Sequence, residues 1–281
     1  MASRAFTSLL QAIEKGAFPR TRKWLWRGLY NGLSRHWRDD DWRFMNYGFV
    51  DQAAAFPLHS DDEPDRPFIG LYAQAVAGLP ITDAQVVEIG SGRGGGARYI
   101  ARYHNPAWVV GIDYSATTVG RARGLNDDAV GLSFEIGDAE RLPLETASCD
   151  IVVNIESSHC YSDVPAFARE VARVLKPGGW FTFADMRGKA AIADLRRQLM
   201  VPGLQLRSER DLSAGVVAAL DAAEHRKRAR LGQVRFGRAF IAEFSGSQGS
   251  TLYRELTEGG VIYLAQRYQK VADPLQEPSS T

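Results

Sequence analysis

VVEIGSGRGGG, residues 86–96, is a short apolar run that ends at a carboxylate and passes into a glycine-rich turn. Gly90, Gly92 and Gly94 allow positive φ angles there and a close approach of the backbone to a ligand. Glycines at this spacing are common in loops, but this turn follows a predicted strand and precedes a predicted helix. Asp113 ends the next apolar run, roughly twenty residues further on. This order indicates a ligand site at the carboxyl end of the first strand of an α/β sheet.

The alternation of short apolar strands with helices continues to about residue 186 and predicts a parallel sheet covered by helices on both faces. We interpret residues 1–281 as one domain, because no linker rich in proline and serine separates its parts. The expected parts are a helical cap at 1–78, an α/β core at 79–186, a helical insertion at 187–245, closing strands at 246–272 and a disordered tail at 273–281.

Composition limits the class of protein. A chain of 281 residues, 45% hydrophobic and 24% charged, has the composition of a globular protein with a sizeable core. The net charge of +1 does not favour a nucleic-acid partner, and the basic cluster HRKRAR at 225–230 has no interleaved aromatic residues. Two cysteines cannot build a disulfide framework. Neither a signal peptide nor a run near the roughly 20 apolar residues of a membrane span is recognisable, so we expect a cytoplasmic protein.

Acidic residues near the turn distinguish between nucleotide cofactors. Glu88 lies two residues before the first glycine, where its charge would repel a pyrophosphate but suits the cationic methionine end of S-adenosylmethionine. Asp113 can accept hydrogen bonds from the two hydroxyls of a ribose. In GDAERLP, residues 137–143, Asp138 can accept a hydrogen bond from the adenine amino group, and Ala139 offers a backbone N–H. These residues favour S-adenosylmethionine over a dinucleotide.

In the motifs EIGSGRGGG, GIDYS, GDAERLPL, SCDIVVNIESSHC and VLKPGG, the sequence resembles the class I S-adenosylmethionine-dependent methyltransferases over roughly residues 84–186. The resemblance implies a Rossmann-like α/β fold with a mostly parallel seven-stranded sheet, and S-adenosylmethionine as cofactor. FMNYGF, PLHSDDEPDRPFIGLY, SHCY and GSQGS make the chain similar to the mycobacterial phthiotriol/phenolphthiotriol dimycocerosate, glycopeptidolipid and fatty-acid O-methyltransferases.

The resemblance also implies which residues hold the cofactor. An N-terminal aromatic segment in such enzymes helps to close the cofactor cavity, so Tyr47 and Asn46 are candidates to touch the methionine end, with ordinary packing of the cap as the alternative. The expected cofactor residues are Tyr47, Glu88, Gly90, Ser91, Gly92, Gly94, Asp113, Tyr114, Asp138, Ala139, Asn154 and Glu156.

NIESSHCY, residues 154–161, follows the fourth predicted strand and carries a carboxylate, an imidazole and a thiol. Ligands of open α/β sheets bind at the carboxyl ends of the strands, so His159 and Asp185, after the fourth strand and in the fifth, can meet over one cavity. Similarity to sugar O-methyltransferases of natural-product pathways implies His159 as general base and Asp185 as its assistant. The alternative is a loop histidine that caps a helix.

Two further interpretations of the same stretch are weaker. A metal site would need three or four well-spaced ligands, whereas His159, Cys160 and Glu156 are too close together to wrap one ion. A Cys160 nucleophile would serve a covalent intermediate that methyl transfer does not need. We therefore expect no metal and assign Cys160 to the cavity wall.

The expected activity is methyl transfer to a hydroxyl or carboxyl oxygen of a hydrophobic lipid, polyketide or glycolipid acceptor. Alternatives are a sugar or macrocyclic acceptor, methylation at carbon, and a non-catalytic lipid-binding protein on the same fold. RKWLWRGLYNGLSRHW, residues 22–37, suits either a cap helix or a peripheral contact with an anionic membrane, because apolar and aromatic side chains recur at helical spacing among basic ones. A homodimer is the other partner that we consider.

Overall fold

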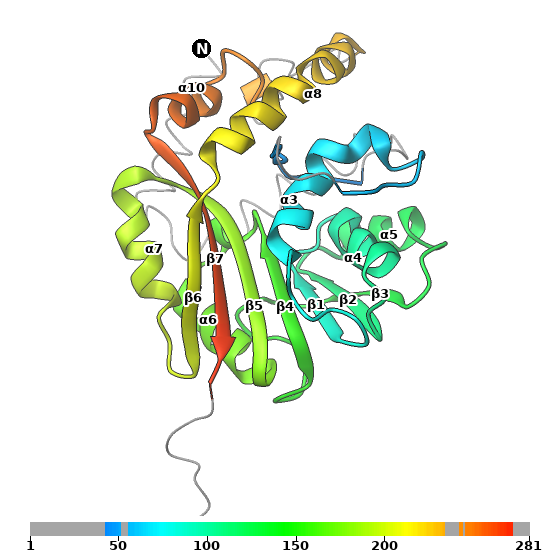
Figure 1. Ribbon diagram of the computed structural model, residues 1–281, viewed down its shortest axis with the longest axis vertical. Coiled ribbons are helices and arrows are strands. Elements are labelled where there is room, and N and C mark those ends of the chain that lie inside the picture. The colour runs from blue at the N-terminus through cyan, green and yellow to red at the C-terminus, as the bar shows by residue number, and fades with distance from the viewer. Residues whose placement is uncertain (1–42, 52–55, 234–241, 244, 272–281) are drawn as a thin grey trace, which may run out of the picture.

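The computed structural model describes residues 43–51, 56–233, 242–243 and 245–271 (Figure 1). The basic aromatic segment at 22–37 and the tail at 273–281 lie outside these described residues.

A sheet of seven strands in the order β3-β2-β1-β4-β5-β7-β6 forms the centre of the fold (Figure 1). Its first five strands in this order run parallel, and β7 lies antiparallel between β5 and β6. This arrangement confirms the predicted mostly parallel α/β sheet. The strands are β1 (Gln85–Ile89), β2 (Trp108–Asp113), β3 (Leu132–Ile136), β4 (Cys149–Ile155), β5 (Leu175–Gly188), β6 (Leu204–Asp211) and β7 (Val261–Lys270).

Helices cover both faces of the sheet, and each face has its own hydrophobic core. One core joins α3, α4, α5, α8 and α10, and the other joins α6 and α7. Successive side chains of β1 alternate between them, with Val86 in the first and Val87 in the second. The helices are α3 (Arg66–Val76), α4 (Gly95–Tyr103), α5 (Ala116–Leu125), α6 (Val164–Val174), α7 (Ile192–Leu199), α8 (Ser213–Gln233) and α10 (Thr251–Glu258), with single turns η1 (Glu63–Asp65), η2 (Ser158–Cys160) and η3 (Lys189–Ala191).

Short polar side chains cap α5 and α6, two of the helices that begin at the carboxyl edge of the sheet. Ser115 accepts a hydrogen bond from the N–H of Thr118 at 3.1 Å and caps the start of α5. Asp163 accepts from the N–H of Ala166 at 2.8 Å and begins α6 in the same way. These caps satisfy N–H groups that the first helical turn leaves without partners.

The C-terminal third departs from the expectation of a helical insertion followed by closing strands. Strand β6 lies inside the region 187–245, and the region 246–272 holds one helix, α10, and one strand, β7. The sequence LQLRSERD of β6 concealed the strand, because it carries charged side chains on both faces and is exposed along almost its whole length. Hydrogen bonds to β7 along one edge hold this strand in the sheet, and a hydrophobic pattern is not required there.

Helices α3 and α4 approach each other closely at Gly96. A Cβ atom at this position would lie 2.0 Å from two ring atoms of Tyr72, whereas a Cβ at Gly120 on α5 would meet nothing within 4 Å. Because Gly96 has no side chain, α3 can pack closely on α4. Gly120 is a helical glycine with no neighbour near its Cβ position, so it serves as a comparison.

We expect Gly96→Ala to lower the free energy of unfolding by about 1–3 kcal/mol, because the added methyl group overpacks the Tyr72 contact. Gly120→Ala is the matched control and should leave stability unchanged or raise it by about 0.5–1 kcal/mol, since alanine favours a helix interior. Urea unfolding followed by circular dichroism measures both changes. Equal stability of the two variants would contradict the close approach of α3 and α4.

Candidate active site

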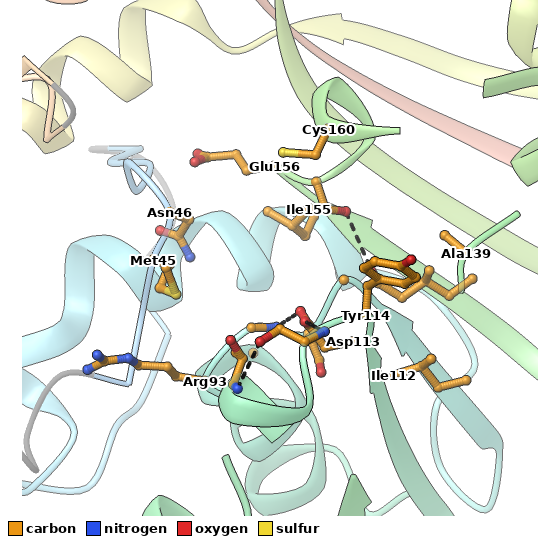
Figure 2. A pocket seen from close by; sticks show the side chains of 18 of the residues that line it. Met45, Asn46, Arg93, Ile112, Asp113, Tyr114, Ala139, Ile155, Glu156 and Cys160 are labelled. Carbon is orange, nitrogen blue, oxygen red and sulfur yellow. Dashed lines mark hydrogen bonds between the residues drawn. The ribbon is translucent and has the colours of Figure 1, made fainter. Parts of the chain in front are cut away.

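One cavity lies at the carboxyl ends of β1, β2 and β4, where ligands bind in open α/β sheets (Figure 2). Strand β1 lies between β2 and β4, so helices leave to opposite faces on either side of it. The wall is formed by the segment 43–46, the glycine turn, the residues after β2 and β3, and the loop after β4. Segments far apart in sequence thus meet at one edge of the sheet.

The glycines of this turn allow its backbone to lie close to neighbouring groups. Gly90 has φ of +73°, and a Cβ atom there would lie 2.4 Å from the side chain of Ser157. Gly94 has φ of +84° and precedes α4, where a Cβ would lie 2.3 Å from the ring of Phe134. Left-handed backbone and close neighbours both require glycine at these two positions.

Asp113 ends β2 and faces the turn. Its carboxylate accepts hydrogen bonds from the N–H of Gly92 at 3.0 Å and the N–H of Ser115 at 2.9 Å. Burial raises the pKa of Asp113, and these two backbone N–H groups oppose that rise. Asp113 therefore joins the glycine turn to the start of α5 and holds a carboxylate at the cavity wall.

The polar groups of the cavity suit a nucleoside cofactor. Among the buried polar atoms of the lining, the Ser91 hydroxyl oxygen and the Asn46 amide oxygen accept or donate no hydrogen bond among the described residues. Buried polar atoms normally have partners, so both suit the polar end of a bound molecule. Eight of the residues predicted to hold the cofactor line the cavity, namely Gly90, Ser91, Gly92, Asp113, Tyr114, Asp138, Ala139 and Glu156.

Four predicted residues, Tyr47, Glu88, Gly94 and Asn154, are not among the lining residues. Asn154 is fully buried and donates to the Ile89 carbonyl at 2.8 Å and the Tyr161 hydroxyl at 2.9 Å. It therefore ties β4 to β1 and fixes the loop from behind. Sequence spacing identified the end of β4 but did not show which way this side chain points.

Glu88 lies beneath the glycine turn. One carboxyl oxygen accepts a hydrogen bond at 2.7 Å from the hydroxyl of Tyr72, which itself lines the cavity. Burial raises the pKa of Glu88 to about 8, although the Tyr72 hydroxyl and the N–H of Ala97 lower it. Glu88 therefore contacts the ligand cavity through Tyr72, and it does not present a bare carboxylate to a cationic group as its position in the sequence suggested.

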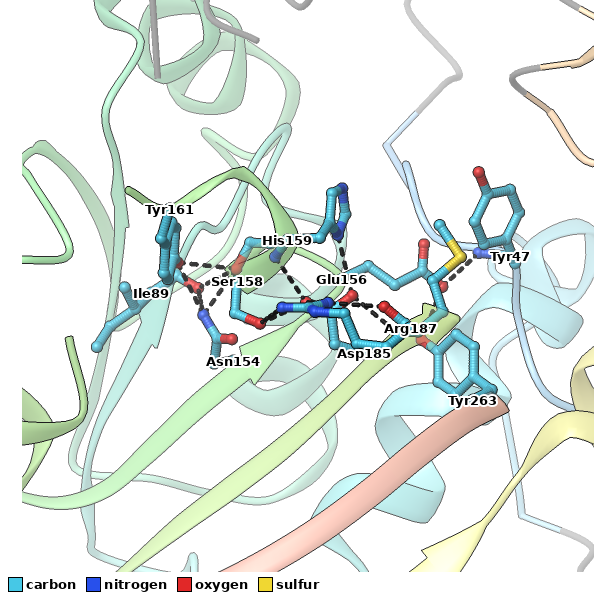
Figure 3. Close-up of polar contacts among 12 residues, drawn as sticks. Tyr47, Ile89, Asn154, Glu156, Ser158, His159, Tyr161, Asp185, Arg187 and Tyr263 are labelled. Carbon is cyan, nitrogen blue, oxygen red and sulfur yellow. Dashed lines mark hydrogen bonds and ion pairs between the residues drawn. The ribbon is translucent and has the colours of Figure 1, made fainter. Parts of the chain in front are cut away.

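Glu156 lines the cavity and also contacts the N-terminal segment and β7 (Figure 3). One carboxyl oxygen accepts from the N–H of Tyr47 at 2.9 Å and from the hydroxyl of Tyr263 on β7 at 2.7 Å. Its backbone has φ of +47°, which is uncommon for a residue with a side chain and indicates local strain. Burial raises the pKa of Glu156 to about 8, against the hydrogen bonds from Tyr47 and Tyr263, which lower it.

The structure brings His159 and Asp185 together, as the sequence analysis expected. The Nδ1 atom of His159, in η2, lies 2.9 Å from Oδ1 of Asp185 on β5 (Figure 3). Neither residue lines the cavity itself, but Glu156 and Cys160 on either side of His159 do. Cys160 thus stands in the wall, where the sequence analysis assigned it.

Asp185 is fully buried and accepts hydrogen bonds from every side. Its Oδ2 accepts from the hydroxyl of Ser158 at 2.6 Å and from the N–H of His159 at 3.0 Å. Its Oδ1 accepts from the N–H of Met186 at 2.8 Å, and an Arg187 nitrogen lies 3.1 Å from Oδ2. Sequence reasoning missed Arg187 and Ser158, although both are neighbours in sequence of the predicted pair.

These contacts shift both ionisation equilibria. Burial raises the pKa of Asp185, but the Arg187 guanidinium and His159 outweigh it and hold that pKa well below its usual range. Burial alone lowers the pKa of His159, but the Cys160 sulfur and the Asp185 carboxylate outweigh it, so the pKa lies well above 6.5. Asp185 therefore stays ionised and holds a proton on His159.

In the part of the chain that the structure describes, no group of three or more His, Cys, Asp or Glu side chains could hold a metal ion. Within the same residues, every helix is too short or too polar to traverse a lipid bilayer.

Known proteins resemble this chain over most of its length. The family described as Methyltransferase domain matches residues 87–183. The phthiotriol/phenolphthiotriol dimycocerosates methyltransferase of Mycobacterium leprae is 32% identical over 269 residues, which cover 95% of this chain and 99% of that protein. The fatty-acid O-methyltransferase of Mycolicibacterium smegmatis is 38% identical over 194 residues, which cover 69% of this chain and 70% of that protein.

Solved structures share the fold at low sequence identity. The cyclase SpnF has a TM-score of 0.67 at 16% identity and covers 87% of this chain and 95% of its own. The geranyl diphosphate C-methyltransferase of Streptomyces coelicolor A3(2) has a TM-score of 0.62 at 18% identity and covers 86% of this chain and 98% of its own. Its crystals contain S-adenosyl-L-homocysteine.

The glycine turn and the acid that ends β2 indicate the same family as the relatives that match this chain over nearly its full length. The chain therefore belongs to the class I S-adenosylmethionine-dependent methyltransferases, in the group that includes the phthiotriol/phenolphthiotriol dimycocerosates methyltransferases.

Proposed function

We propose that this enzyme transfers a methyl group to an oxygen of a hydrophobic lipid, polyketide or glycolipid acceptor, with His159 as the general base. The observation that carries the proposal is the 2.9 Å contact of His159 with the buried Asp185, beside the cavity that suits the cofactor. The relatives named for phthiotriol dimycocerosates and fatty acids support a lipid acceptor.

Asp185 determines which nitrogen of His159 can take a proton. Its ionised carboxylate only accepts hydrogen bonds, so Nδ1 of His159 must carry the hydrogen between them. In the neutral imidazole, the lone pair then lies on Nε2, the atom that can receive a proton from an acceptor hydroxyl. The pair thus resembles other Asp–His arrangements in which the carboxylate fixes the tautomer.

Bound S-adenosylmethionine supplies an already activated methyl group. The protein must then hold the acceptor oxygen in line with that group and take up its proton as the new bond forms. Glu156 and Cys160 line the cavity on either side of His159 in sequence, and their position suits an acceptor oxygen that enters between them. A carboxylate acceptor has no proton to lose at neutral pH, so only a hydroxyl acceptor needs the base.

We expect Asp113→Ala to weaken binding of S-adenosylmethionine by about 10- to 100-fold, because charge-assisted hydrogen bonds contribute about 1.5–3 kcal/mol each. Isothermal titration calorimetry measures the change. Asp194→Ala, an exposed carboxylate on α7, is the matched control and should bind as the wild-type protein does. Unchanged binding by Asp113→Ala would contradict the assignment of this cavity to the cofactor.

We expect His159→Ala to lower kcat for a hydroxyl acceptor by about 10²- to 10⁴-fold while cofactor affinity stays unchanged, because the variant lacks the proton acceptor. Transfer of labelled methyl groups, with products identified by mass spectrometry, measures the loss. His59→Ala, an exposed histidine, serves as the control and should turn over normally. If His159→Ala still turns over a hydroxyl acceptor, His159 is not the general base, although the family assignment stands.

The pH dependence of kcat/KM should show an acid limb above pH 6.5, because only neutral His159 accepts a proton and its pKa is raised. Rate should therefore fall as the pH drops through this raised pKa. A profile recorded from pH 6 to 10 with a hydroxyl acceptor at low concentration measures the limb. A limb at or below pH 6.5 would be inconsistent with His159 as the titrating base.

A further inference from the structure

Arg187 is held in one position beside Asp185 (Figure 3). It comes from β5, two residues after Asp185, and its side chain is only 14% exposed. One nitrogen donates to the Met186 carbonyl at 2.7 Å and lies 3.1 Å from Oδ2 of Asp185, and the other donates to the Ser158 hydroxyl at 2.8 Å. A planar guanidinium with three fixed partners cannot turn away from the carboxylate without losing them.

The two oxygen atoms of Asp185 therefore each face a different basic side chain. Oδ1 faces Nδ1 of His159, and Oδ2 faces Arg187 and the Ser158 hydroxyl. With Asp185 alone, the full negative charge would act on the imidazole and stabilise its protonated form. With Arg187 in place, the charge of the carboxylate is already balanced by a cation that never loses its proton in the working pH range.

We propose that Arg187 is a positioning residue that shares the carboxylate of Asp185 and so limits how strongly Asp185 holds a second proton on His159. The inference rests on the proposed function for its consequence, because a base that stays protonated cannot accept a proton from an acceptor hydroxyl. Arg187 touches neither the cavity nor any reacting atom and acts through Asp185.

Other charged or titratable groups also face His159 and Asp185. Cys160 follows His159 in η2, Glu156 begins the loop after β4, and Tyr263 projects from β7. Tyr47 in the segment 43–51 interacts with Asp185 and with Glu243. These groups are acids, so each either is neutral or favours the protonated imidazole. Arg187 is the cation among the groups named here, and its removal should therefore move the equilibrium of His159 in one direction only.

The decisive measurement is the titration of His159 itself, which needs neither cofactor nor turnover. The five histidines of the chain can be followed by NMR of the imidazole carbons, and His159→Asn identifies the signal of interest by its absence. We expect Arg187→Met to raise the pKa of His159 by about one unit, which is about tenfold less neutral imidazole at a pH below both values. Arg187→Lys keeps the charge and should titrate close to the wild-type protein.

His104 provides an internal reference, because it lies after α4 and should titrate unchanged in every variant. If Arg187→Met does not fold by circular dichroism, Arg187→Gln removes the same charge and keeps an amide donor for Ser158 or Met186. Kinetics add a second readout: the acid limb of kcat/KM should move to higher pH in the neutral variants and stay in place in Arg187→Lys.

The outcomes separate this inference from the proposed function. If the neutral variants leave the titration of His159 unchanged, or if Arg187→Lys shifts it equally, Arg187 is only a structural contact and the inference is wrong. If the titration shifts as expected but His159→Ala retains full turnover of a hydroxyl acceptor, the electrostatic role stands and the base assignment fails.

Discussion

The buried charge of Asp185 is the constraint around which the carboxyl edge of this sheet is arranged. An ionised carboxylate that is removed from water costs several kcal/mol unless hydrogen bonds and opposite charges compensate for it. Five groups do so here, from Ser158, His159, Met186 and Arg187. Three of these groups come from the loop after β4 and two from β5 itself, so compensation of the charge holds the loop against the strand and fixes the position of the imidazole.

Glu156 links the loop after β4 to β7 and to the N-terminal segment through hydrogen bonds. Its carboxyl group accepts hydrogen bonds from Tyr47 and Tyr263, which come from opposite ends of the described chain. The left-handed backbone at Glu156 turns the chain so that its side chain reaches these partners while the next residues form η2. The loop after β4 therefore contributes Glu156 to the cavity and His159 to the hydrogen bonds around Asp185, so the cavity and these hydrogen bonds lie next to each other.

Much of this site could be predicted because it depends on order along the chain. Asp113 ends β2, and the turn follows β1, so any parallel sheet with these strands as neighbours places them together. The pairing of His159 with Asp185 followed from the same rule for β4 and β5. The contact of Glu88 with Tyr72 could not be predicted in this way, because the hydroxyl that covers Glu88 belongs to α3.

The sequence by itself determined the parallel α/β character of the cofactor half, the glycine turn and the acidic residues near the strand ends, because local spacing and the alternation of strands with helices suffice for them. Tertiary structure alone decided that β6 is a strand, since its only structural signal is the hydrogen-bonded edge of β7. It also decided the partners of Asp185. Arg187 lies outside every motif, and the motif that contains Ser158 gave no role to this residue; only the burial of one carboxylate between two strand ends gives them a function.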